Sequence, residues 1–150
     1  MKIIASRAGF TLIELVVVLL VIGLGAGTVI PAAGRTLSRT RLQRAANVVA
    51  TDIQLAHSTA ARRRAPVRMS VDTINRVVRI VDHATPTTVY SERYYNSSSE
   101  YAVQRFVARP TTVVFYPNGL ANDTIRFTLT GSNETRLVRM SRVGQIRFTQ

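Results

Sequence analysis

The sequence predicts an α+β protein in which a long N-terminal helix, membrane-spanning in its first half, packs on a mainly antiparallel β-rich domain. Three observations support this fold class. Residues 10–34 are mostly apolar with Glu14 as their only charged side chain, residues 35–64 contain no Gly or Pro, and after Pro66 the apolar residues recur with a period of two. At 150 residues, the chain has room for one domain beside the helix, because single cores usually occupy roughly 100–200 residues.

The first element is a short basic leader followed by an apolar segment. Residues 1–9 carry Lys2 and Arg7. Residues 10–34 would span about 37 Å as a helix, enough for a bilayer core of about 30 Å. A basic leader tends to stay in the cytoplasm. We therefore predict a leader at 1–9, a transmembrane and assembly helix at 10–34, and an extracytoplasmic location for the rest.

Glu14 is the anomaly of the apolar segment. An acidic side chain there costs about 2.5–3.5 kcal/mol and needs a partner. Cleavage after Gly9 supplies one, because the new amine of Phe10 is cationic and can pair with Glu14 of a neighbouring subunit. Small residues at 31–34 imitate a conventional signal-peptide site, but cleavage there gives Glu14 no role.

Pro31 is expected to break the apolar helix, since proline removes a hydrogen-bond donor and clashes with the preceding turn. Residues 35–64 then continue as an amphipathic helix. Its apolar stripe consists of Leu42, Ala45, Val49, Ile53, Ala56 and Ala60, and its polar face of Arg35, Arg39, Gln43 and Asp52. Three arginines at 62–64 and Pro66 indicate where this helix ends.

Residues 65–150 are predicted to form the β-rich domain. Alternating apolar residues predict strands near 67–71 and 77–81, and the turn residues that separate the later runs favour an antiparallel meander. The later strands are expected at Thr111–Tyr116, Thr124–Thr130, Thr135–Ser141 and Gln145–Thr149. Residues 82–110, which hold four of the five tyrosines, are interpreted as a polar excursion or as a hairpin with aromatic pairs.

The composition argues against metal sites and against catalysis. There is no Cys, and His57 and His83 are 26 positions apart without a zinc-binding pattern. We expect both histidines at the surface, and no metal or other cofactor. The acidic residues outside the apolar segment are scattered, with no nucleophile–base pattern. The sequence therefore predicts a protein that is not an enzyme.

The segment AGFTLIELVVVLLVIG resembles the class III signal of type IV prepilins and type II secretion pseudopilins. The resemblance implies that a prepilin peptidase cuts between Gly9 and Phe10 and methylates the Phe10 amine, and that Glu14 serves assembly. It also implies that the partners are other pilins or pseudopilins in a helical filament, together with membrane lipid. The implied location is the bacterial inner membrane, with the N-terminus cytoplasmic and the β-rich domain periplasmic, from which the subunit joins a periplasmic pseudopilus or pilus.

The three-arginine helix stop, the Phe115–Gly119 turn and a last strand opened by Gly144 resemble the GspH/FimT group. This likeness implies an H-type minor pseudopilin of a type II secretion system, a filament or tip subunit that aids pseudopilus assembly and protein secretion. The alternative is a FimT-like minor pilin of a type IV pilus, with a basic face that binds DNA for uptake.

Strand alternation places Arg126, Arg139 and Arg147 on the face opposite the apolar residues, which are Ile125, Phe127, Leu129, Val138, Met140, Ile146 and Phe148. Arg142 and Arg136 are expected near the edges of this stripe. The net charge of +12 is compatible with DNA or an acidic secreted protein as partner, or with an ordinary solvated face. The ending Gly144-Gln145-Ile146-Arg147 departs from a G-R-x-R pattern, which weakens the DNA hypothesis.

Overall fold

The computed structural model of the chain describes residues 10–96, 98–101, 103–132 and 134–149, without the side chains of residues 25–35. It divides into two compact units, Met1–Thr36 and Leu37–Gln150. We call the second unit the head. The predicted leader, with Gly9, lies outside the described residues.

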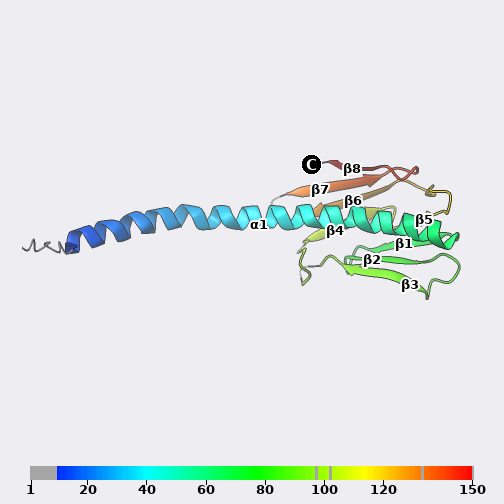
Figure 1. Ribbon diagram of the computed structural model, residues 1–150, viewed down its shortest axis with the longest axis horizontal. Helices are drawn as coiled ribbons and strands as arrows, with labels where there is room; N and C mark the ends of the chain where they lie inside the picture. The colour runs from blue at the N-terminus through cyan, green and yellow to red at the C-terminus, as the bar shows by residue number, and fades with distance from the viewer. Residues whose placement is uncertain (1–9, 97, 102, 133, 150) are drawn as a thin grey trace, which may run out of the picture. The chain divides into compact units, whose positions relative to one another are not determined.

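The helix α1, Leu12–Arg63, begins with a cap that the sequence analysis did not identify (Figure 1). The Oγ1 atom of Thr11 accepts a hydrogen bond from the backbone N–H of Glu14 at 3.3 Å. A Thr followed three residues later by Glu is the capping-box spacing, and an acid in the first turn favours the helix dipole. The cap stabilises the start of the helix at Leu12.

The end of α1 agrees with the prediction from the arginine triplet. Arg62 and Arg63 lie in the last turn, and Arg64 leaves the helix with a positive φ of 52°. The middle of α1 differs from expectation, because the helix runs through Pro31 without the predicted break. Proline costs about 3 kcal/mol inside a helix, a penalty that a helix of 52 residues can absorb.

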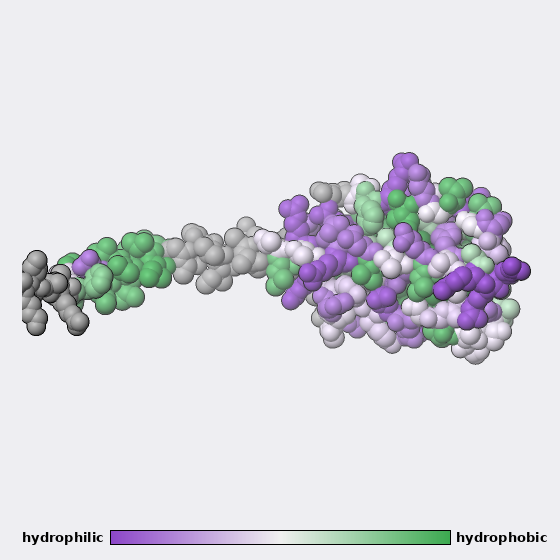
Figure 2. Space-filling view, in the orientation of Figure 1, coloured by the Kyte–Doolittle hydropathy of each residue, from purple (hydrophilic) through white to green (hydrophobic). Residues whose placement is uncertain are grey.

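The described side chains of the first unit are exposed and mostly apolar. Phe10 is 83% exposed and Leu24 69%, and the large apolar residues between them are 45–81% exposed. Figure 2 shows this segment as an almost continuous hydrophobic surface. Among the described residues, we find no helical segment whose length and apolar character together suffice for a membrane crossing.

The strands of the head form two four-stranded antiparallel sheets. The first sheet has the order β3-β2-β1-β5 and the second β4-β6-β7-β8. Figure 1 shows β7 and β8 of the second sheet above α1 and β1, β2 and β3 of the first sheet below it. The strands are β1 Val67–Asp72, β2 Val77–Asp82, β3 Val89–Tyr94, β4 Arg105–Arg109, β5 Thr112–Phe115, β6 Ile125–Thr130, β7 Thr135–Met140 and β8 Ile146–Thr149.

The last four strands were predicted to within one residue at each end, but the predicted single meander is only partly right. β1-β2-β3 and β6-β7-β8 are meanders, whereas β4 pairs with β6 and β5 pairs with β1. The chain thus changes sheet after β3, after β4 and after β5. Two sheets give two apolar faces that can share one helix, which a single short meander cannot.

The core lies between α1 and the inner faces of both sheets. The predicted stripe of α1 is buried, with Ile53, Ala56 and Ala60 at 0% exposure. The apolar face of the second sheet is buried as predicted along β6 and β7, but Phe148 on the edge strand β8 is 52% exposed. An edge strand has a neighbour on one side only, and this leaves Phe148 in contact with solvent.

Residues 82–110 are not a polar excursion, because they contain β3, β4 and part of the core. The ring of Tyr95 stacks on Phe106 with centroids 4.9 Å apart and lies 5.3 Å from Tyr101. Phe106 in turn lies 5.8 Å from Phe127 of β6. These aromatic contacts join the chain after β3 in the first sheet to the second sheet.

Candidate functional site

The predicted processing site is described only in part. Gly9 lies outside the described residues, Phe10 is exposed, and Glu14 is exposed in the first turn of α1. The Glu14 carboxylate forms no ion pair with any described residue, and the bond to Thr11 uses its backbone N–H. The carboxylate is therefore available to a partner outside this chain, and its role in assembly stays a prediction.

A second candidate site is a line of arginines across the second sheet, which we call the arginine row: Arg109, Arg126, Arg139 and Arg147. In the register of the sheet, Arg109 is opposite Arg126, Arg126 is opposite Arg139, and Arg139 is opposite Arg147. All four side chains are exposed. The row thus places one guanidinium group on each of four adjacent strands.

The row includes a residue that the sequence analysis missed. Arg109 and its neighbour Arg105 belong to β4, in the stretch for which no strand was predicted. The sequence did contain a signal for this strand, namely apolar side chains at 106 and 108 between arginines at 105 and 109. In the structure Phe106 and Ala108 are buried while Arg105 and Arg109 are exposed. Which strand β4 joins is a tertiary feature, and the sequence pattern does not specify it.

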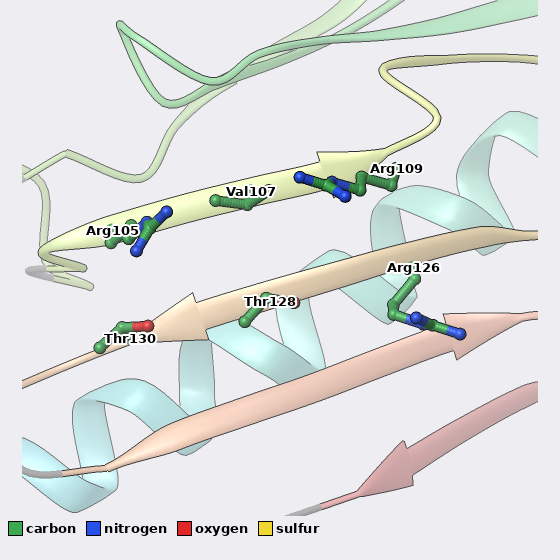
Figure 3. Close-up of a pocket in the computed structure, with 6 residues that line it drawn as sticks. All are labelled: Arg105, Val107, Arg109, Arg126, Thr128 and Thr130. Carbon is green, nitrogen blue, oxygen red and sulfur yellow. The ribbon is translucent and has the colours of Figure 1, made fainter.

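Two shallow depressions lie on the outer face beside the row. One, of about 320 Å³, is lined by Arg105, Val107 and Arg109 of β4 and by Arg126, Thr128 and Thr130 of β6. Figure 3 shows these side chains on one face of the sheet, with α1 behind it. The other, of about 240 Å³, is lined by Arg139, Ser141, Gln145 and Arg147. Each depression combines guanidinium donors with hydroxyl or amide groups, which suits oxyanions such as carboxylates or phosphates.

The two arginines predicted near the edges of the stripe have different environments. Arg142 is exposed in the turn after β7, and its backbone carbonyl accepts the N–H of Ala121 at 2.8 Å. Arg136 faces inward instead. Its side chain is 12% exposed and pairs with Glu134 at 3.3 Å, so it does not belong to the basic face.

A buried acid on α1 corrects the predicted polar face of that helix. Asp52 is 2% exposed and accepts hydrogen bonds from Arg93 Nε at 3.0 and 3.1 Å and from the Tyr95 hydroxyl at 2.7 Å. Burial raises the pKa of the Asp52 carboxyl, while the hydrogen bond from Tyr95 and the charge of Arg93 act against this. The cluster ties α1 to β3 and has a structural role.

His57 is half-buried, contrary to the predicted surface position. Its ring meets Phe115 edge-on with centroids 4.5 Å apart, and Nε2 is buried without a hydrogen-bond partner among the described residues. Burial lowers the pKa of His57. Gly144, at φ 78°, approaches so closely that a Cβ atom there would lie 3.1 Å from His57 Nε2. The turn between β7 and β8 therefore requires glycine at this position.

The comparisons with known proteins agree on the kind of protein. The profile described as type II transport protein GspH matches residues 45–144, and that of the prokaryotic N-terminal methylation motif matches residues 4–30. A search of the curated proteins finds no match.

Two crystal structures of the type IV minor pilin FimU from Pseudomonas aeruginosa (strain PAO1) have a similar fold. One has a TM-score of 0.61 and 16% identity, covering 75% of this chain and 90% of that chain. The other has a TM-score of 0.56 and 15% identity, covering 73% and 93%. At this identity the likeness establishes the fold alone, and it confirms the predicted pilin-like architecture. With the family profile covering most of the head and the methylation motif at the N-terminus, the chain belongs to the GspH family of type IV pilin-like proteins.

Proposed function

We propose that the chain is an H-type minor pseudopilin of a type II secretion system, a filament or tip subunit that aids pseudopilus assembly and protein secretion. The observation that carries the proposal is the presence on one chain of a GspH-type head and an N-terminal methylation motif. The exposed apolar surface of the first half of α1 supports it, because such a surface needs lipid or neighbouring helices around it.

The proposal includes processing and location. A prepilin peptidase cuts between Gly9 and Phe10 and methylates the new amine, and the amine then pairs with Glu14 of a neighbouring subunit. Before assembly, residues 10–34 anchor the chain in the inner membrane with the head in the periplasm. The basic leader supports this orientation.

The test compares two substitutions at the start of α1 in the native host. Glu14→Ala removes the carboxylate but keeps the backbone N–H that Thr11 caps, whereas Thr11→Ala removes the cap and keeps the carboxylate. We expect Glu14→Ala to be cleaved normally but recovered in isolated filaments at about a tenth of the normal amount or less, since an unpaired amine in lipid costs several kcal/mol. Thr11→Ala should assemble almost normally, because a cap contributes only about 1 kcal/mol.

Two results would contradict the proposal. One is normal incorporation of Glu14→Ala, which would remove the pairing. The other is a native chain whose mass places its first residue at Met1 or after Ala33, which would remove the processing site. Mass spectrometry of the same filament samples measures both cleavage and methylation.

A second candidate is a FimT-like minor pilin of a type IV pilus that takes part in DNA uptake. The fold similarity to a type IV minor pilin favours it, as does the arginine row, which suits a phosphate backbone. Affinity isolation of the tagged chain distinguishes the two hosts. Recovery with type II secretion components supports the first candidate, and recovery with pilus components supports the second.

A further inference from the structure

The four arginines of the row have no acidic partner among the described residues, in contrast to several other arginines of the head. Elsewhere in the head, Arg39 pairs with Glu134, Arg79 with Glu92 and Arg93 with Asp52. None of the four guanidinium groups of the row forms an ion pair within the described part of the chain, although Arg147 donates to the Gln145 side chain at 3.4 Å. The outer face of the second sheet therefore carries positive charge that the head itself does not neutralise.

This arrangement has a cost in stability. Like charges directly opposite each other on adjacent strands are destabilising, and the row contains three such pairs in succession. A solvated basic surface has no need of this register, because arginines scattered over the face give the same net charge with less repulsion. The register is therefore better explained by an anionic partner that neutralises the row.

The spacing of the row identifies the shape of that partner. Adjacent strands lie about 4.8 Å apart, so the four positions extend over about 14 Å. Acidic side chains on successive turns of an α-helix repeat about every 5.4 Å, and four of them extend over about 16 Å. On an extended strand, side chains of one face repeat about every 6.7 Å, and four extend over about 20 Å. The helix is the better match to the row.

The positions next to the row fit a protein better than a nucleic acid. Two residues along each strand from the row, on the same face, lies a second line of cross-strand neighbours: Val107, Thr128, Leu137 and Thr149. Val107 and Leu137 offer aliphatic surface, and arginine beside apolar side chains is typical of protein interfaces. No described residue of the outer face is aromatic, so nothing there can stack on exposed bases.

We propose that the outer face of the second sheet is a docking site for an acidic α-helix of a partner protein, which lies across the strands along the arginine row. Carboxylates on one stripe of that helix pair with Arg109, Arg126, Arg139 and Arg147, and its flank packs on Val107 and Leu137. The inference goes beyond the proposed function, because it concerns the occupant of this face and not the assembly of the filament. Its failure would leave the filament assignment unchanged.

The test uses the full-length protein in a non-ionic detergent and a pair of synthetic helical peptides. One peptide carries glutamates at i, i+4, i+7 and i+11, and the other has the same composition with the glutamates spread around the helix. We expect the striped peptide to bind about tenfold more tightly than its isomer, with an affinity that falls as salt is raised. Fluorescence anisotropy of labelled peptides measures both affinities.

Substitutions locate the binding on the sheet. Arg126→Glu with Arg139→Glu reverses the middle of the row, and we expect about a tenfold or greater loss of affinity for the striped peptide. The matched control is Arg41→Glu with Arg44→Glu, which makes the same change in net charge on exposed positions of α1, away from the outer face. The control should bind as the unaltered protein does. If circular dichroism shows that the double glutamate variant is not folded, Arg126→Gln with Arg139→Gln replaces it. We again expect a loss of affinity for the striped peptide.

Three outcomes would overturn the proposal. The first is equal binding of the two peptides, or no binding of either. The second is an equal loss of affinity in the control pair, which would reduce the effect to net charge. The third is tighter binding of a short DNA duplex that displaces the striped peptide, which would assign the face to nucleic acid instead.

Discussion

Two groups of arginines in the head, one in each sheet, have opposite environments. In the first sheet, Arg79 and Arg93 reach carboxylates, and Arg76 in the turn before β2 donates to the Val103 carbonyl at 3.1 Å. In the second sheet, the arginine row projects into solvent without an acidic partner among the described residues. Arg93 in the first sheet thus helps to hold the head together, while the row in the second sheet is available to another molecule. The same residue type is structural or functional according to whether a carboxylate is within its reach.

The largest effect is expected from the buried pair of the first sheet. Arg93→Ala leaves the Asp52 carboxylate with Tyr95 as its only remaining partner in the cluster, at 2% exposure. Removing one partner of a buried pair typically costs about 3–5 kcal/mol, and the partial exposure of Arg93 reduces this to about 2–3 kcal/mol. Chemical denaturation measures the loss in the free energy of unfolding.

The control for this comparison is Arg139→Ala in the second sheet. It removes the same side chain from a position without an ion pair, and we expect no loss of stability. Equal losses in the two variants would show that the arginines of the two sheets are not functionally different.

How far the sequence predicts the fold depends on whether a feature is local. The strands β6 to β8 were predicted closely because apolar residues recur at alternate positions along most of their length and their turns carry Gly or Asn. Asp52 was placed on the polar face because of its charge, although it lies three residues after Val49 and four before Ala56, both of which are on the buried stripe. Its partner Arg93 is 41 positions away, so the pairing that makes burial tolerable has no local signal.

The candidate site follows the same rule. Alternation alone correctly placed Arg126, Arg139 and Arg147 on one exposed face. Arg109 was missed because it joins the row only through the pairing of β4 with β6. In the sequence these two strands are separated by β5, which belongs to the other sheet. Tyr95 was assigned to a polar stretch because its neighbours are Asn and Ser, although the ring itself inserts into the core.

An intermediate effect is expected at the place where α1 meets both sheets. His57 contacts Phe115 of the first sheet and lies under Gly144, next to the second sheet. Its pKa is lowered by burial from the ordinary 6.5, so the unfolded chain binds the proton more readily than the folded one. The contribution of neutral His57 to the free energy of unfolding is therefore fully present above about pH 6.5. This contribution is lost as the pH falls through the lower pKa of the folded state.

The measurement is the melting temperature from pH 7.5 to pH 5, compared between the unaltered protein and His57→Phe. We expect a fall of a few degrees on acidification that is smaller in the variant, because phenylalanine fills the same space and cannot take up a proton. Parallel pH profiles of the two proteins would assign the acid sensitivity to another group. They would also show that His57 does not make the contact between α1 and the two sheets sensitive to pH.

The smallest effect is expected from relieving the repulsion within the arginine row. Arg139 has an arginine directly opposite on each side, so Arg139→Thr removes two like-charge contacts and places a residue with good strand propensity on an exposed site. We expect the melting temperature at low salt to rise by about 1–3 °C, and the rise should shrink at 0.5 M salt because salt screens exposed charges. The same variant should bind the striped acidic peptide less well. A substitution that stabilises the protein while it weakens binding is the combination expected of a residue kept for a partner, and a loss of stability would instead indicate that Arg139 supports the sheet as the arginines of the first sheet do.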